Sequence, residues 1–383
     1  ACLPQVLRRG TAKLPGLRAI GEALDELYGA RIESAVRKEG ETLCIGFLSD
    51  CIDEAYAPGA AGLTARVIRL LADLLYDPYL QDGVFCPDYT AGERENLIDR
   101  IAAQKNDPRS WAPKRLTELM CNDEAYGQPA LGTTEQARKI TEKKLYAAYQ
   151  RALGEAQVEL FYCGTMAPDA VEALFADTPL VRQRAGAPYQ PQTQIVAQPA
   201  GAPREVIEEE QVTQGKLSLG FRTGGHCLTG GDPAACWMFQ TLYGGSTSSK
   251  LFLNVRERKS LCYYASAQFI ASKGLMMVNS GIENKDFETA RDEIVRQLEA
   301  CRAGDITDAE IESARKTLTT NWRAMLDDPL TLERYWLGQA AAGTLVAPEE
   351  RIAQVQGVTR KRIVAAAQAT ALDTVYFMKG AAQ

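Results

Sequence analysis

The predicted order of helices and strands runs through this chain twice, and this repeat restricts the fold more than any other feature. In the first pass, residues 6–11 lead through a helix into the segment 28–35. In the second pass, residues 241–247 lead through a helix into the segment 261–267. A repeat of about 190 residues is too long for a solenoid unit and indicates two related domains.

The composition changes between the two passes to Gln, Pro, Ala and Gly, from about residue 183 to residue 203. Such a stretch can contribute little to a hydrophobic core, so we predict an interdomain linker there. We expect an N-terminal domain at 1–185, a linker at 186–203 and a C-terminal domain at 204–383. The predicted fold class is α+β, with two homologous α/β-sandwich domains, each a mostly antiparallel sheet packed with helices.

Apolar periodicity places the individual elements. We predict helices at 1–9, 17–27, 64–76, 93–103, 111–120, 135–153, 234–243, 251–258, 285–303, 308–326 and 349–369. We predict strands at 43–48, 158–164, 216–221 and 373–379, and a hairpin formed by 262–270 and 275–281.

The histidine count excludes most hydrolytic mechanisms, because the 383 residues include only His226. A zinc site built on two or three His cannot form within the chain, and a Ser-His or Cys-His pair could use only this residue. His226 and Cys227 lie in a Gly-rich loop, and two adjacent ligands without partners make a poor metal site. We therefore expect an exposed loop histidine.

Charge and cysteine usage limit the partners and the compartment. The net charge of −6 argues against nucleic acid or an anionic membrane as a partner. No apolar run reaches the roughly 18 residues of a membrane span. The ten cysteines form no C-x-x-C pair, which is typical of buried free thiols in a reducing compartment. There is no signal-peptide pattern, so we expect a cytoplasmic protein.

Arg256 and Tyr263 stand seven residues apart across a predicted corner between a helix and a strand. If both side chains reach one face, a guanidinium and a phenol could bind a peptide carbonyl or an oxyanion. The alternative is an Arg stabilised at a helix C-terminus and a Tyr in the core, which the residues alone favour. The preceding Gly-rich segment lacks the spacing of a phosphate-binding loop, so we expect a tight helix connection with Thr247 or Ser248 as N-cap.

The sequence around this corner resembles a known motif. It reads Gly-Gly-Ser-Thr-Ser-Ser-Lys-Leu-Phe-Leu-Asn-Val-Arg-Glu-Arg-Lys-Ser-Leu-Cys-Tyr-Tyr-Ala-Ser-Ala at 244–267. It is similar to the motif in the C-terminal half of the pitrilysin/insulinase family, which includes the mitochondrial processing peptidase type, and the resemblance covers nearly the whole chain. It implies two similar domains that face each other like a clamshell around an extended peptide. In active members an inverted H-x-x-E-H helix, followed by a Gly-Thr turn, holds zinc together with a Glu from a later helix.

The zinc half of this pattern is missing from the chain. Residues 10–11 match the Gly-Thr turn. The positions that correspond to the zinc ligands and the general base are occupied by Ala1, Pro4, Gln5 and Arg100. Because these side chains cannot replace His and Glu around Zn²⁺, the resemblance implies no zinc and no cofactor in this chain.

The substrate-binding half of the pattern is present. The resemblance implies that Arg256 and Tyr263, with Gly245 and Ser246 from the same motif, bind the substrate near the scissile bond. The main hypothesis is therefore a non-catalytic, substrate-binding subunit of a heterodimeric zinc metallopeptidase acting on peptides. A catalytic H-x-x-E-H homologue would be its partner and would hold the zinc.

Two alternatives remain. The chain could be a peptidase-like scaffold or a peptide-binding protein with no role in hydrolysis, in which Arg256 and Tyr263 are inherited structure. It could also be a free-standing hydrolase with an unrecognised site, against which the single histidine argues. Co-purification of an H-x-x-E-H chain would discriminate between the main hypothesis and the scaffold.

Overall fold

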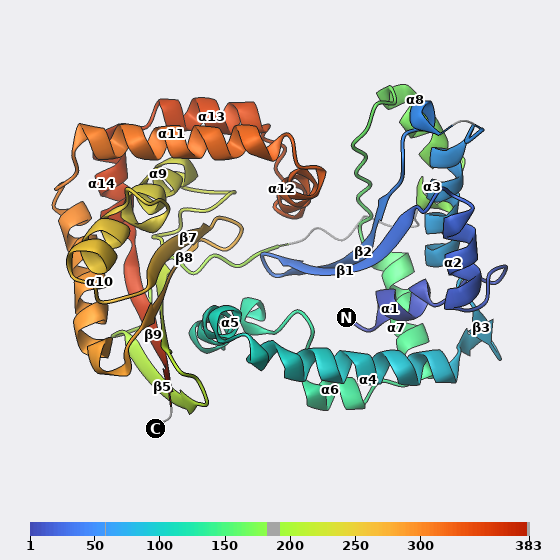
Figure 1. Ribbon diagram of the computed structural model, residues 1–383, viewed down its shortest axis with the longest axis horizontal. Helices are drawn as coiled ribbons and strands as arrows, with labels where there is room; N and C mark the ends of the chain where they lie inside the picture. The colour runs from blue at the N-terminus through green and yellow to red at the C-terminus, as the bar shows by residue number, and fades with distance from the viewer. Residues whose placement is uncertain (58, 182–191, 381–383) are drawn as a thin grey trace. The chain divides into compact units, whose positions relative to one another are not determined.

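The computed structural model describes residues 1–57, 59–181 and 192–380 (Figure 1). Its contacts define two compact units. Unit 1 consists of Ala1–Lys38, Leu43–Ala103 and the described residues of Pro129–Gln190; unit 2 consists of Glu39–Thr42, Gln104–Gln128 and the described residues of Pro191–Gln383. Both units combine helices with sheets, which confirms the predicted α+β class. Residues 186–191 of the predicted linker lie outside the described residues.

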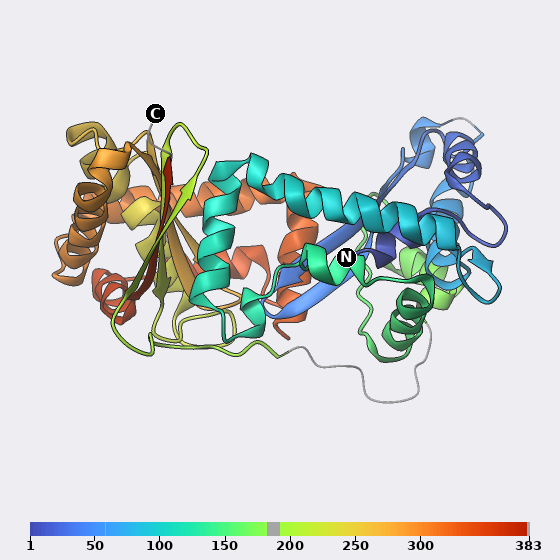
Figure 2. The same cartoon turned by 90° about the horizontal axis from the view of Figure 1, so that it is seen from below.

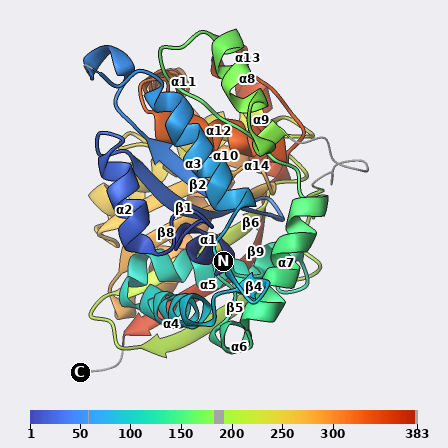
Figure 3. The same ribbon diagram turned by 90° about the vertical axis from the view of Figure 1, so that its right-hand side faces the viewer.

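The elements of unit 1 are helices and two small sheets. They are α1 (Leu3–Arg8), α2 (Leu17–Asp25), β1 (Arg31–Glu39), β2 (Thr42–Asp50), α3 (Leu63–Tyr76), β3 (Leu80–Gln81), β4 (Val84–Phe85), α4 (Pro87–Ala103), α6 (Thr134–Arg138), α7 (Glu142–Glu155) and α8 (Pro168–Ala176). In Figure 3, which faces this unit, α1 lies between α3 and α4 and contacts both. Leu3, Val6 and Leu7 of α1 share an apolar cluster with Leu97 of α4.

Unit 2 is built around a five-stranded sheet. Its elements are α5 (Pro108–Met120), β5 (Arg204–Glu210), β6 (Gly215–Arg222), α9 (Pro233–Gly244), the π-helix η5 (Leu251–Arg258), β7 (Tyr264–Ile270), β8 (Leu275–Ile282), α10 (Phe287–Arg302), α11 (Asp308–Met325), α12 (Pro329–Ala341), α13 (Pro348–Gln356), α14 (Arg360–Ala369) and β9 (Ala371–Gly380). The strand order is β5-β9-β6-β8-β7, and only the β5–β9 pair is parallel.

Helices cover both faces of this sheet, with α9, α10 and α14 on one side and α5 on the other (Figures 1 and 2). Alternate residues of strand β9 belong to the two faces of the sheet, because successive side chains of a strand point in opposite directions. Val375 and Phe377 belong to the apolar cluster of the α9 side, whereas Tyr376 and Met378 belong to the cluster of the α5 side.

Helix α5 belongs to unit 2 because its apolar stripe packs on the sheet. Ala112, Leu116 and Met120, spaced four residues apart, are buried in one cluster with Met277 and Tyr376. The segments Glu39–Thr42 and Gln104–Gln128 therefore join unit 2, although both fall within the predicted first domain 1–185. The predicted domain boundaries, at 1–185 and 204–383 with a linker at 186–203, stay a prediction.

Two long predicted helices are each divided, because a Thr starts a new helix within the apolar pattern. The helix predicted at 135–153 is α6 and α7, and the hydroxyl of Thr141 accepts a hydrogen bond from the Lys144 N–H at the start of α7. The helix predicted at 349–369 is α13 and α14, and Thr359 caps α14 in the same way.

The predicted repeat is visible in the order of the elements along the chain. Helix, helix, hairpin and helix follow one another as α1, α2, β1–β2 and α3, and again as α9, η5, β7–β8 and α10. Four helices then follow in each pass, namely α4 to α7 and α11 to α14.

The strand predicted at 158–164 is wrong, since this segment is not in a ladder. Its counterpart in the repeat, β9, pairs with β5 and β6, which precede α9. An apolar run forms a strand only where a second segment pairs with it, and none of the described residues pairs with 158–164. Among the described residues, no helix combines the length and apolarity needed to cross a bilayer.

Candidate functional site

The corner between η5 and β7 is a tight chain reversal. Leu251 and Val255 bury one side of η5 in the core of unit 2. The Leu261 N–H donates to the Val255 carbonyl (3.0 Å), and the Ser260 N–H donates to the Arg256 carbonyl (3.0 Å). Ser260 adopts a left-handed φ of 52°, which turns the chain back toward the sheet. The corner thus ends the helix two residues after Arg256 and starts β7 directly after Tyr263.

The Arg256 side chain is exposed (42%) at this corner. Its guanidinium lies 4.7 Å from the centre of the Phe252 ring, one turn earlier, and its Nε lies 3.6 Å from Glu257 Oε1. These contacts are weak in water and leave most of the guanidinium donors available to a ligand.

Tyr263 is 60% exposed, and its hydroxyl donates to Glu283 Oε1 (2.7 Å) at the end of β8. Its N–H donates to the Gly281 carbonyl (2.9 Å), which fixes its backbone to the sheet. The hydrogen bond to Glu283 raises the pKa of the phenol, so the hydroxyl stays protonated at neutral pH and remains a donor. The contacts found among the described residues include none between Arg256 and Tyr263, so their joint action stays a prediction.

The buried carboxylate of Glu293, which the sequence patterns did not identify, binds Lys259 next to the corner. Glu293 of α10 is 3% exposed and binds Lys259 Nζ (2.6 Å), Arg296 Nε (2.8 Å) and Gln297 Nε2 (2.7 Å). Burial alone would raise its pKa, but the hydrogen bonds from Arg296, Lys259 and Gln297 outweigh burial and lower the pKa to about 2. The signal was present in the sequence: Glu293 and Gln297 interrupt the apolar face formed by Ala290, Ile294, Leu298 and Cys301.

Gly245 and Ser246 end α9 and begin the connection to η5. A Cβ at Gly245 would lie 2.7 Å from the Thr241 Cα, so the close turn requires glycine. The Ser246 hydroxyl lies 3.1 Å from that of Ser248, and neither caps η5. The predicted N-cap at Thr247 or Ser248 is wrong, because the Phe252 N–H donates to Ser249 Oγ (3.4 Å) instead. The structure does not test whether Gly245 and Ser246 bind substrate.

The four positions that correspond to the family's zinc ligands and general base lie at or near two helices, α1 and α4, which contact each other. Ala1, Pro4 and Gln5 are at or within the first turn of α1, and the exposed Arg100 is near the end of α4. Arg9 Nε and Glu93 Oε1 (2.7 Å) join the same two helices. A methyl group, a proline ring, a carboxamide and a guanidinium do not provide a zinc site.

Within the ranges that the structure describes, no group of three or more His, Cys, Asp or Glu side chains could hold a metal ion. His226 is half-buried, which corrects the predicted exposure. Its Nδ1 accepts a hydrogen bond from the Asp232 N–H (2.8 Å), so it stabilises the Gly-rich loop.

Comparisons with known proteins agree with the predicted family. Residues 139–318 match the family described as "Peptidase M16 inactive domain". The chain is 34% identical over 380 residues to the "probable inactive metalloprotease YmfF" of Bacillus subtilis, covering 99% of this chain and 88% of that protein. It is 25% identical over 307 residues to an "uncharacterized zinc protease" of Mycobacterium leprae, covering 78% and 67% of the two chains. A conserved protein from Enterococcus faecalis of known crystal structure superimposes with a TM-score of 0.86 at 28% identity, covering 100% and 89%.

Proposed function

Since this chain belongs to the M16 (pitrilysin/insulinase) family of peptidases, we propose that it is the non-catalytic, substrate-binding subunit of a heterodimeric zinc metallopeptidase acting on peptides. Its partner in this proposal is an H-x-x-E-H homologue, whose zinc would activate the attacking water. A catalytic role for this chain alone is opposed by its own sequence, which has one histidine and therefore no H-x-x-E-H motif.

The observation that carries the proposal is the exposed corner formed by Arg256 and Tyr263. A guanidinium remains cationic at all relevant pH values, and the Tyr263 phenol is neutral at pH 7 like any phenol, a state that the hydrogen bond to Glu283 reinforces by raising its pKa. These are the two donor types that would polarise a scissile carbonyl and stabilise the oxyanion formed from it. Tyr263 would do so by exchanging its hydrogen bond to Glu283 for one to the substrate.

Two variants test this role in the assembled heterodimer, with hydrolysis of a fluorogenic peptide as the readout. Tyr263→Phe removes only the hydroxyl, and Arg256→Ala removes the guanidinium. We expect each to leave assembly intact and to lower kcat roughly 10²-fold, the usual loss for one oxyanion donor.

The matched controls are Tyr56→Phe and Arg360→Ala. Tyr56 is 78% exposed in unit 1, and the half-exposed Arg360 forms an ion pair with the exposed Asp308. Both controls should keep wild-type turnover. Unchanged turnover in both Tyr263→Phe and Arg256→Ala would contradict a role in hydrolysis and would favour the scaffold alternative. The cytoplasmic location stays a prediction.

A further inference from the structure

We infer that Glu293 of α10 is a positioning residue, which holds η5 in the conformation that presents Arg256 to the substrate. This inference rests on the proposed function and extends it to a residue outside the exposed corner. Glu293 acts indirectly, since its carboxylate binds the side chains of Lys259, which directly follows η5, and of Arg296 and Gln297 in α10.

The carboxylate is tied to η5 on both sides of Arg256. Three residues after Arg256, Lys259 Nζ lies 2.6 Å from Glu293 Oε2. Two residues before Arg256, the Asn254 side-chain amide donates to Gln297 Oε1 (2.7 Å). Gln297 Nε2 in turn donates to Glu293 Oε1 (2.7 Å), so Glu293 also fixes which way the Gln297 amide points.

Burial makes these ties specific. Glu293 is 3% exposed and Gln297 is 4% exposed, so in the folded chain their polar groups depend on protein partners. A buried carboxylate is stable only while its hydrogen bonds are made. Displacement of η5 from α10 would therefore leave part of the Glu293 charge unpaired, which resists such movement.

The conformation of η5 needs this support. A π-helix is rare and usually occurs as a short segment at a functional site, because its backbone geometry is less favourable than that of an α-helix. Leu251 and Val255 anchor η5 to the core. The guanidinium of Arg256 has its ring and ionic contacts with Phe252 and Glu257, which both belong to η5, so the conformation of η5 decides where the guanidinium lies.

The first test is amide hydrogen exchange in the isolated chain, which needs no partner. Glu293→Gln keeps the size of the side chain and removes its charge. We expect the amides of 251–259 to exchange about tenfold faster, which corresponds to the loss of one hydrogen bond to a charged group. Glu299→Gln, at an exposed position of the same helix, is the matched control and should change nothing there. Unchanged exchange at 251–259 in Glu293→Gln would overturn the inference.

The second test is a double-mutant cycle on kcat in the heterodimer. Glu293→Gln alone should lower kcat about tenfold, with KM changed less than kcat. In an Arg256→Ala background it should lower kcat no further, because its effect passes through Arg256. A purely structural role would reduce the melting temperature and leave kcat per folded heterodimer unchanged. Losses that multiply in the double variant would likewise overturn the inference.

A third variant covers the case in which Glu293→Gln does not fold. Asn254→Ala removes the hydrogen bond from η5 to Gln297 and leaves no buried charge unpaired. It should reproduce the faster hydrogen exchange and the lower kcat on a smaller scale. Unchanged exchange and unchanged kcat in Asn254→Ala would then count against the inference. If Arg256→Ala and Tyr263→Phe both leave turnover unchanged, the proposed function is wrong, and hydrogen exchange alone decides whether Glu293 holds η5.

Discussion

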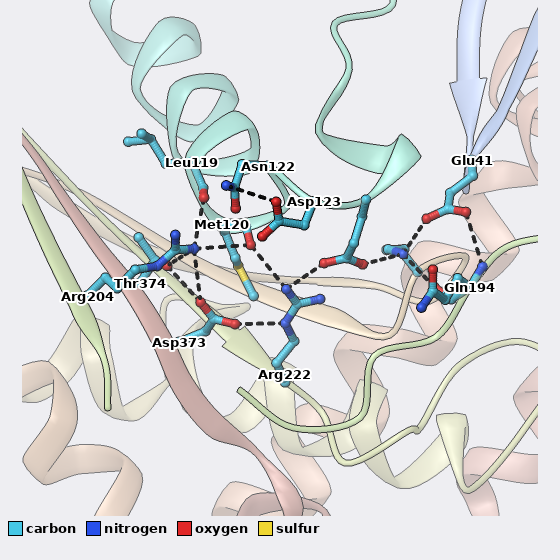
Figure 4. A network of polar contacts seen from close by, with 12 residues as sticks. Glu41, Leu119, Met120, Asn122, Asp123, Gln194, Arg204, Arg222, Asp373 and Thr374 are labelled. Carbon is cyan, nitrogen blue, oxygen red and sulfur yellow. Dashed lines mark hydrogen bonds and ion pairs between the residues drawn. The ribbon is translucent and has the colours of Figure 1, made fainter. Parts of the chain in front are cut away.

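Unit 2 contains two groups of polar and charged side chains that differ in burial. We expect the buried group to stabilise the fold and the exposed group to bind substrate. The first group is an ion cluster formed by Arg222, Lys273, Glu41, Glu124 and Asp373 (Figure 4). Lys273 is 0% exposed and Arg222 is 4% exposed. The second group is the corner, where Arg256 is 42% and Tyr263 60% exposed.

In the ion cluster, each cation is bound by two carboxylates. Lys273 Nζ lies 2.6 Å from both Glu41 Oε1 and Glu124 Oε2. Arg222 lies 2.7 Å from Glu124 and 2.8 Å from Asp373. Burial would raise the pKa of Glu124, but its bonds to Arg222 and Lys273 prevail and lower it. These donors are buried and bound within the fold, whereas those at the corner are exposed and have only exposed carboxylates as ionic or hydrogen-bond partners, which a ligand can replace.

The largest effect that we predict from this comparison is the loss of stability in the variant Lys273→Met. The change leaves Glu41 without its buried counter-ion and Glu124 with Arg222 alone, which should lower the free energy of unfolding by about 3–5 kcal/mol. Urea denaturation measures it, with the exposed Lys379→Met as control. If the free energy of unfolding falls by less than about 1 kcal/mol, which is the contribution of an exposed ion pair, the ion cluster stabilises the fold no more than the exposed corner does.

The next effect is on turnover. Arg256→Ala and Tyr263→Phe should reduce turnover of the heterodimer roughly 10²-fold while changing the free energy of unfolding by no more than about 0.5 kcal/mol. The reason is that both side chains are exposed and stabilise little in the free chain. If either variant is destabilised as strongly as Lys273→Met, the corner is structural as well.

Glu293 lies between the two groups, being buried like the first and attached to the second. Its folded-state pKa of about 2 is below the value of 4.5 for a free Glu, so its stabilisation is complete above about pH 4.5 and is lost as the pH falls toward 2. The stability difference between wild type and Glu293→Gln should therefore shrink by about 2 kcal/mol between pH 6 and pH 3. Urea midpoints at the two pH values measure it, and a constant difference would contradict the pairing of Glu293.

The smallest effect concerns the turn at Ser260, whose φ of 52° is unfavourable for a residue with a Cβ. Ser260→Gly should raise the free energy of unfolding by up to about 1 kcal/mol and leave turnover intact. Thermal unfolding checks it. A lower melting temperature would show that Ser260 contributes contacts beyond its backbone conformation.

Sequence patterns predicted most helices and strands of unit 2, because apolar periodicity reports burial against a neighbouring layer, but they missed strand β5 and helix α12. The hairpin β7–β8 and the strands β6 and β9 lie where the sequence placed them. The strand at 158–164 was wrong because a ladder needs partners, which a local apolar run does not reveal. The packing of α5 on the second unit's sheet was missed, because a pattern identifies a buried face but not what covers it.

The candidate site shows the same limit. The spacing of Arg256 and Tyr263 identified the corner, and the structure places both side chains in solvent. Glu293 was missed although it interrupts the apolar face of α10, whereas Lys273 was missed because its partners are far away in the sequence. Lys273 and Glu41 are 232 residues apart, and only the folded chain brings them together.

The central claim is that this chain completes a peptidase whose zinc lies on another chain. The most direct test measures peptide hydrolysis by the H-x-x-E-H homologue alone, by this chain alone and by their mixture, with zinc counted in each. We predict hydrolysis only by the mixture, with about one zinc per heterodimer and none bound to this chain. Full activity of the homologue alone, or two chains that do not associate, would contradict the account.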